Sequence, residues 1–140
     1  MITLKVKKLD DRAKLPTRAY NSAGYDLYCI GDWVINPNSR VGIRIGISCE
    51  FPEDFVALIW DKGSTGVKGL IRLCGVIDSD YRGEWLVWLH NLSTDPVHFV
   101  SGSKVAQVLF QRKETVAIQL VEDLTLTPRG DKCLGSSGTH

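Results

Sequence analysis

The sequence has no Cys-x-x-Cys pair, no long apolar run and almost no net charge, and each absence excludes a class of protein. Its four cysteines are widely separated, so the ligand spacing of a structural zinc site is missing. No apolar stretch approaches the roughly 20 residues of a membrane-spanning helix. The net charge of +1 gives no reason to expect stable nucleic-acid binding. We therefore expect neither a membrane protein nor a nucleic-acid-binding protein.

The first residues, Met1 to Lys5, also lack the apolar core of a secretory signal. We therefore expect free thiols and a cytoplasmic location, or the interior of the host cell if the chain is viral. A length of 140 residues suits one domain with a modest core. The hydrophobic content of 44% and the charged content of 24% are ordinary for a globular protein.

Short apolar segments with period two dominate, and no long stretch has the period of an amphipathic helix. Residues rich in Pro, Gly, Asn and Ser separate these segments. Many short strands between such turns predict an all-β fold, an antiparallel barrel or sandwich. At most one helical turn is expected, within residues 63–68. The expected strands lie at 2–7, 33–35, 41–47, 55–60, 85–89, 97–100, 105–110 and 116–121.

The pattern stops after Asp123. Residues 128–140 contain Pro128, three glycines and two adjacent serines, and such a segment buries little apolar area. We expect one domain over residues 1–127 and a flexible C-terminal arm over residues 128–140. The arm is either a frayed terminus or a segment that orders over a ligand.

The most informative segment is Gly75-Val76-Ile77-Asp78-Ser79-Asp80-Tyr81-Arg82-Gly83-Glu84. It predicts the end of an apolar strand, a turn with two carboxylates, an aromatic ring and an Arg, and then a second strand. Gly75 permits close backbone approach, and a carboxylate at the edge of a buried strand can act as a base. These residues suit a small ligand with a planar part and a reacting part. A β-hairpin with a solvated acidic turn is the alternative.

Four other segments accompany this hairpin, and they are Ala23 to Leu27, Asp61 to Gly66, Gly102 to Gln107 and Arg129 to Gly138. In order and spacing, the five segments resemble the five motifs of the trimeric dUTP pyrophosphatases (dUTPases). The resemblance covers roughly residues 23–138, and the hairpin is its most specific part. It implies a dUTPase-like β-clip fold, an antiparallel, jelly-roll-like barrel with a flexible arm.

The resemblance implies hydrolysis of dUTP to dUMP and pyrophosphate by attack of water on the α-phosphorus. Such a reaction limits uracil incorporation into DNA and supplies dUMP for dTMP synthesis. Asp78 is the expected base that activates the water. Tyr81 resembles the ring that packs against deoxyribose and excludes ribonucleotides by a steric clash at the 2′ position.

The resemblance also implies that main-chain groups of the hairpin read the uracil edge, with a further contact near Leu86. Cytosine would leave buried polar groups unpaired there. Some relatives carry Asn where Arg72 stands, and since Arg accepts no hydrogen bond, a base contact at Arg72 has to be main chain. The expected base-reading residues are Arg72, Leu73, Cys74, Gly75, Val76, Ile77 and Leu86.

Lys62, Gly63 and Ser64 align with a phosphate-binding segment that usually reads Arg-Ser-Ser or Arg-Ser-Gly. Lys62 lacks the bidentate fork of Arg, and Gly63 lacks a hydroxyl, but the backbone of a Gly-rich turn can hold phosphate. Asp26 resembles the acidic residue that organises Mg²⁺ through water. Gln107 resembles a residue near the phosphate and metal waters.

In the arm, Arg129 is expected to approach the γ-phosphate. Ser136, Ser137 and Gly138 resemble a phosphate-wrapping loop. Leu134 stands where the family usually has a Phe that stacks on uracil, so it covers the base without a π-face. The resemblance further implies a homotrimer whose subunits share each active site, with dUTP as substrate and Mg²⁺ as cofactor.

Two alternatives use the same scaffold. One is a non-catalytic nucleotide-binding or regulatory protein, for which Gly63 and Leu134 are the supporting departures from the family pattern. The other is a dCTP deaminase, which would need a Glu beside the pyrimidine amino group. No residue of the hairpin before Asp78 is acidic, which argues against the deaminase.

Overall fold

The computed structural model describes residues 1–133, and within that range it contains eleven strands and one short helix. All the strand pairs are antiparallel. The expected all-β fold is therefore confirmed. The elements are β1 (Lys5–Lys8), β2 (Tyr25–Tyr28), β3 (Trp33–Ile35), β4 (Arg40–Arg44), β5 (Ile47–Glu50), β6 (Phe55–Trp60), α1 (Gly63–Gly66), β7 (Leu70–Leu73), β8 (Val76–Ile77), β9 (Leu86–Asn91), β10 (Val97–Phe99) and β11 (Lys104–Arg112).

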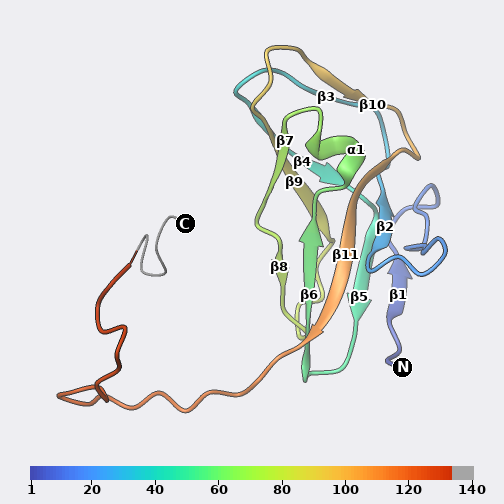
Figure 1. Cartoon of the computed structure of the whole chain (residues 1–140). Helices are drawn as coiled ribbons and strands as arrows, with labels where there is room; N and C mark the ends of the chain where they lie inside the picture. Colours follow the sequence, from blue (N-terminus) through green and yellow to red (C-terminus); the bar gives the residue numbers. More distant parts are fainter. Residues whose placement is uncertain (134–140) are drawn as a thin grey trace.

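Two larger sheets and two strand pairs make up the body of the molecule (Figure 1). The four-stranded sheet has the order β2-β11-β6-β8, and the three-stranded sheet has the order β4-β9-β7. The pairs β1-β5 and β3-β10 complete the body. Because β8 pairs with β6 and β7 pairs with β9, the β7–β8 connection runs from one larger sheet to the other.

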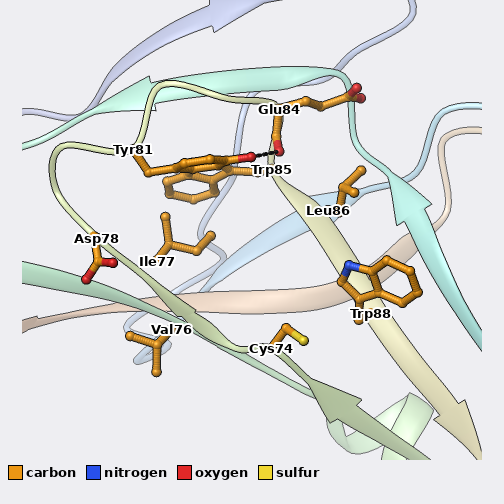
Figure 2. A pocket seen from close by; sticks show the side chains of 9 residues that line it. All are labelled: Cys74, Val76, Ile77, Asp78, Tyr81, Glu84, Trp85, Leu86 and Trp88. Carbon is orange, nitrogen blue, oxygen red and sulfur yellow. Dashed lines mark hydrogen bonds between the residues drawn. The ribbon is translucent and has the colours of Figure 1, made fainter.

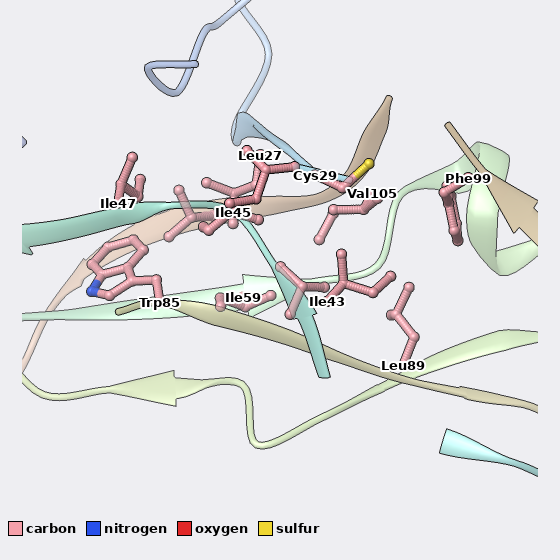
Figure 3. Close-up of a cluster of buried hydrophobic side chains, with 14 of the residues drawn as sticks. Leu27, Cys29, Ile43, Ile45, Ile47, Ile59, Trp85, Leu89, Phe99 and Val105 are labelled. Carbon is pink, nitrogen blue, oxygen red and sulfur yellow. The ribbon is translucent and has the colours of Figure 1, made fainter. Parts of the chain in front are cut away.

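The core lies between these sheets and is built mainly from β-branched and aromatic side chains (Figure 3). Alternation along β9 shows how it forms, because Val87 and Leu89 are fully buried whereas Leu86 and Trp88 on the other face are half-buried. Trp85, just before β9, is also fully buried and meets Phe51 edge to face, at 6.3 Å between ring centroids. Period-two alternation thus places one face of β9 in the core and leaves the other available.

The apolar run at 41–47, expected as one strand, is divided into β4 and β5. Gly46 interrupts it with a φ of +70°, a backbone conformation that favours glycine. Its N–H donates to the Glu84 carboxylate at 3.1 Å, and Arg44 pairs with the same carboxylate at 3.1 Å. The Glu84 carboxylate therefore connects the end of β4 and the kink at Gly46 to the segment that leads into β9.

The single helical turn expected at 63–68 is confirmed as α1. Buried Thr65 orders it, because its hydroxyl accepts from the Lys62 N–H and donates to the Lys62 carbonyl, both at 2.9 Å. α1 is four residues long, and none of residues 1–133 form a helix with the length and apolar character needed to cross a membrane.

The strand expected at 116–121 does not form. Beyond β11, residues 113–133 run away from the body as an extended segment without regular structure (Figure 1). Ile118 and Leu120 are 96% and 97% exposed. A strand requires a neighbouring strand for its backbone hydrogen bonds, and within residues 1–133 no strand lies beside residues 116–121.

Candidate active site

A pocket of about 240 Å³ opens between β8, the turn that follows it and β9 (Figure 2). Six of the residues expected at a substrate site line it: Cys74, Val76, Ile77, Asp78, Tyr81 and Leu86. Three further lining residues, Glu84, Trp85 and Trp88, were not identified from the sequence. Period-two alternation from Leu86 would have placed Trp88 on the same face, and this was the signal available for it.

Asp78 follows directly after β8, whose residues Val76 and Ile77 pair with Leu58 and Ala57 of β6. Its side chain is exposed at the rim of the pocket. Among residues 1–133, none donates a hydrogen bond to the Asp78 carboxylate, although its main-chain carbonyl accepts from the Tyr81 N–H at 3.2 Å. The carboxylate is thus free to accept a hydrogen bond from a water molecule or a ligand.

Tyr81 is held in one orientation over the pocket. Its hydroxyl donates to the Glu84 carbonyl at 3.2 Å, which Figure 2 shows as a dashed line. A Cβ at Gly83 would collide with the Tyr81 hydroxyl, so the glycine leaves the space that the ring occupies. Tyr81 is 47% exposed as a residue, and its ring presents an apolar surface to a ligand that enters the pocket.

The turn from β7 into β8 is tightly packed on the side away from the pocket. Cys74 has a φ of +51°, and a Cβ at Gly75 would lie 2.6 Å from the Ile59 carbonyl oxygen and 2.9 Å from Arg72 Nη1. The Arg72 guanidinium stacks on Trp60 with its Cζ 4.0 Å from the ring centroid. Close packing within the protein therefore accounts for the glycine at position 75.

Arg72, Leu73 and Gly75 are not among the residues that line the pocket. The Gly75 carbonyl already accepts from the Ile59 N–H at 2.7 Å. Main-chain contacts from these three residues to a base remain a prediction.

A second cluster brings together residues of three separate sequence segments. Asp26 of β2 pairs with Lys62 before α1 and with Lys104 of β11, the latter at 2.7 Å. Gln107 lies opposite Asp26 in the β2–β11 register, and its Nε2 donates to the Asp61 carbonyl at 3.0 Å.

Local packing explains why these segments meet. A Cβ at Gly24 would lie 2.5 Å from Gln107 Oε1, so the glycine makes room for that side chain. The Gly102 N–H donates to the Cys29 carbonyl at 2.8 Å, and the Cys29 N–H donates to the Ser103 carbonyl at 2.9 Å. These bonds join the turn before β11 to the end of β2 and bring Lys104 beside Asp26. Sequence reasoning placed Lys104 within a motif but gave it no role.

Charge balance in this cluster favours an anion. Partial burial by itself raises the pKa of Asp26, but hydrogen bonds from Lys104 and Lys62 outweigh burial and hold that pKa below its ordinary value. The hydrogen bond to Asp26 in turn raises the pKa of Lys104. Two ammonium groups and one carboxylate leave a net charge of +1. Gly63 and Ser64 are exposed beside the cluster, and a Cβ at Gly63 would meet no atom within 4 Å.

The side chains of this cluster offer Mg²⁺ few direct ligands. In residues 1–133, no three His, Cys, Asp or Glu side chains gather as a metal-binding group. Asp26 is a single carboxylate, and both of its oxygens are taken by lysines. Mg²⁺ keeps several waters and needs only one or two carboxylates when phosphates supply other ligands, so Asp26 fits an ion held through water and phosphate.

The arm residues lie apart from both groups. Arg129 is exposed, and its Nε donates to the Lys132 carbonyl at 3.0 Å within the arm itself. Leu134, Ser136, Ser137 and Gly138 lie outside the described residues, and their expected roles remain predictions. No hydrogen bond or ion pair in the described part of the chain joins the pocket to the lysine cluster.

The antiparallel β-body thus carries a free carboxylate at the rim of a pocket and, apart from it, a cluster of two lysines around Asp26. A family model described as dUTPase matches residues 11–138. The chain belongs to the dUTPase family. The resemblance drawn from the five sequence segments is thereby confirmed.

Two relatives show the extent of the similarity. The chain is 40% identical over 143 residues to the deoxyuridine 5'-triphosphate nucleotidohydrolase of Yarrowia lipolytica, covering 99% of this chain and 91% of the relative. It is 37% identical over 135 residues to the protein of the same name from Yaba monkey tumor virus, covering 95% of this chain and 94% of the relative.

Solved structures share the fold. The dUTPase of Staphylococcus bacteriophage 80alpha with dUPNHPP has a TM-score of 0.90 at 24% identity, covering 97% of this chain and 98% of that one. The D95N dUTPase of phage phi11, described with a structural Mg(II) ion, has a TM-score of 0.81 at 22% identity, covering 87% and 98%. At these identities the structures support the fold alone.

Proposed function

We propose that this chain is a dUTP diphosphatase that hydrolyses dUTP to dUMP and pyrophosphate. The observation that carries the proposal is the Asp78 carboxylate, which is free of hydrogen bonds from residues 1–133 and stands at the rim of a pocket that also contains Tyr81. The family membership and the names of the relatives support dUTP as the substrate.

In the proposed reaction, Asp78 accepts a proton from a water molecule as the water oxygen attacks the α-phosphorus. The bond from the α-phosphorus to the oxygen that bridges it to the β-phosphorus breaks. The released pyrophosphate carries that oxygen away, and dUMP remains. Tyr81 packs against the deoxyribose, and its fixed ring leaves no space for a 2′-hydroxyl.

The cluster of Asp26, Lys62 and Lys104 holds the phosphate chain. Lys62 and Lys104 supply positive charge, and Gly63 and Ser64 present the exposed turn beside them. Asp26 would hold Mg²⁺ through water, and the ion would supply positive charge to the phosphate oxygens. Gln107 fixes the turn through its hydrogen bond to the Asp61 carbonyl.

We propose a homotrimer with shared active sites, and the separation of these parts within one chain supports it. Within one chain the first, second and fourth motifs meet at the lysine cluster, whereas the third motif forms the pocket. The segment beyond β11 exposes Val116, Ile118 and Leu120, at 73%, 96% and 97%. Exposed apolar residues with period two are typical of a strand that lacks its partner, and a second copy of the chain supplies that partner.

The described chain has four free cysteines, which supports a location in the reducing interior of a cell.

The deaminase alternative is not favoured by the pocket. Of the described residues that line the pocket, Glu84 is the only acid besides Asp78. Its carboxylate accepts from Arg44 and from the Gly46 N–H, both at 3.1 Å. Figure 2 shows this carboxylate turned away from the other lining side chains. The Glu84 carboxylate therefore holds the β4–β5 kink and does not face the nucleobase of a bound ligand.

The test is pyrophosphate release from dUTP, dCTP, dTTP and UTP, with and without Mg²⁺, by the wild type and by Asp78→Asn. We expect turnover of dUTP alone, and a loss of about 10²- to 10⁴-fold in Asp78→Asn with dUMP binding retained. Asp80→Asn is the matched control, because Asp80 is an exposed neighbour that does not line the pocket. Wild-type turnover in Asp78→Asn, or nucleotide binding by the wild type without turnover, would refute the assignment.

A further inference from the structure

Trp88 lies at the end of the pocket opposite Asp78, a position that none of the five sequence motifs includes (Figure 2). It belongs to the half-buried face of β9, together with Leu86. Figure 2 shows its indole nitrogen on the edge of the ring nearest Leu86, toward the other lining residues. The side chain therefore offers the pocket both an aromatic ring and an N–H donor.

Packing against β4 fixes the ring. Trp88 pairs with Gly42 in the β4–β9 register, and a Cβ at Gly42 would lie 2.7 Å from Trp88 Cε2 and Cζ2. The Trp88 ring thus lies directly against the Gly42 backbone, where any side chain larger than glycine would collide with it. An aromatic side chain that covers a cross-strand glycine gains contact area in one orientation, so the indole is already in place before a ligand arrives.

The indole N–H has no partner in the described part of the chain. Trp33 provides the contrast, because its Nε1 donates to the Ile30 carbonyl at 2.9 Å. Trp88 donates no hydrogen bond to any of residues 1–133. Indole is a donor only, so a ligand that satisfies it has to present an acceptor at this end of the pocket.

The order of residues along the pocket indicates which acceptor that is. Asp78 lies at the phosphate end of the proposed substrate, and Tyr81 lies at the sugar. In a pyrimidine nucleotide the sugar is attached at N1, and the ring atom opposite N1 is C4. C4 carries a carbonyl oxygen in uracil and an amino group in cytosine. A donor at the far end therefore meets an acceptor in dUTP and another donor in dCTP.

We infer that the Trp88 side chain reads the pyrimidine: its indole N–H donates to the O4 carbonyl of uracil and selects dUTP against dCTP. This inference rests on the proposed function and adds a side-chain contact to it. Trp88 is half-buried in the free chain, so a bound base is what covers its N–H. A cytosine amino group placed there would leave the covered donor unpaired, and an unpaired donor disfavours the wrong ligand more than a good hydrogen bond favours the right one.

The experiment compares Trp88→Phe with the wild type in the full-length chain in its native assembly. Phe keeps an aromatic ring over Gly42 but removes the N–H. Trp33→Phe is the matched control, because Trp33 lies in β3, outside the pocket lining, and its indole N–H is satisfied within the protein by the Ile30 carbonyl. We measure kcat and KM for dUTP and dCTP, the dissociation constants of dUMP and dCMP by isothermal titration calorimetry, and the mass of the assembly.

In Trp88→Phe we expect KM for dUTP to rise roughly 3- to 10-fold with kcat nearly unchanged, as for the loss of one hydrogen bond made in both ground and transition states. The preference for dUMP over dCMP, measured as the ratio of their dissociation constants, should narrow at least as much. Trp33→Phe should keep the wild-type values. An unchanged preference in Trp88→Phe, or a change only in the mass of the assembly, would overturn the inference and assign Trp88 to a subunit contact.

The dUMP and dCMP measurements separate this inference from the proposed function. If the wild type binds dUMP through Trp88 but releases no pyrophosphate from dUTP, the hydrolase assignment fails and the base contact stands. If dUTP is hydrolysed by the wild type and by Trp88→Phe with the same preference, the base contact fails and the hydrolase assignment stands.

Discussion

Replacement of Asp26 by Asn should destabilise the protein measurably, because the Asp26 carboxylate pairs with both Lys62 and Lys104. The side chains of Asp26 and Lys62 are only 12% and 21% exposed. A hydrogen bond to a charged group contributes about 1.5–3 kcal/mol when it is largely shielded from water. Lys104, at 47% exposed, can turn to solvent, so we assign the loss to the Lys62 pair. For a chain of this length, that loss lowers Tm by roughly 5–10 °C.

Asp54→Asn is the matched control. Asp54 pairs with Arg112 at 2.9 Å, but these side chains are 45% and 67% exposed. An exposed ion pair contributes about 0–1 kcal/mol, so Asp54→Asn should lower Tm by only a few degrees at most. Both variants are melted at one protein concentration, since subunit association shifts Tm. A Tm loss in Asp26→Asn no larger than that in Asp54→Asn would refute the stabilising role of the cluster.

The pH dependence of the Asp26→Asn effect follows from the two shifted groups. The pKa of Asp26 is lowered in the folded state, so its contribution is present above its unfolded pKa of about 3.9 and is lost as pH falls through the lower folded value. The pKa of Lys104 is raised, so its contribution is complete below about 10.4 and is lost as pH rises through the higher folded value. The Tm difference between wild type and Asp26→Asn should stay flat from pH 5 to 9 and shrink below about pH 4. A difference that changes steadily between pH 5 and 9 would point to another titrating group.

Three further outcomes are expected. Truncation after Thr127 should leave Tm nearly unchanged but reduce dUTP turnover steeply, because residues 128–133 are exposed and bond only among themselves and with residue 127; unfolding of the truncated chain, or full activity, would contradict this. Gly63→Ser should fold normally and lower KM for dUTP, since its Cβ meets open space and its hydroxyl restores a phosphate donor; a raised KM would count against a phosphate contact there. A thiol reagent should modify exposed Cys74 quickly, and dUMP should protect it. Cys29 and Cys49 should react only on unfolding, because burial raises the pKa of both thiols, that of Cys49 to about 12. Equal rates for all thiols would refute the burial argument.

The local sequence determined the class of fold and placed two residues of the proposed site, Asp78 and Tyr81. Period-two alternation and turn residues predicted the strands, and Gly63 to Lys68 predicted the helical turn, because these properties depend on neighbours within a few residues. The five motifs identified the family, and Asp78 and Tyr81 were placed at the pocket because they share one turn with the strand that precedes them. The strand predicted at 116–121 does not form. Local alternation indicates a segment that can become a strand, but it carries no information on whether a partner strand lies beside it.

Only the tertiary structure decided which side chains meet across the sheets. Lys104 reaches Asp26 because hydrogen bonds at Cys29 join the β11 turn to β2, and no sequence spacing encodes that register. Trp88 enters the pocket because Gly42, 46 positions away in the chain, leaves space for its ring. Contacts between distant segments depend on how strands pair and pack, and those choices are made by the core as a unit.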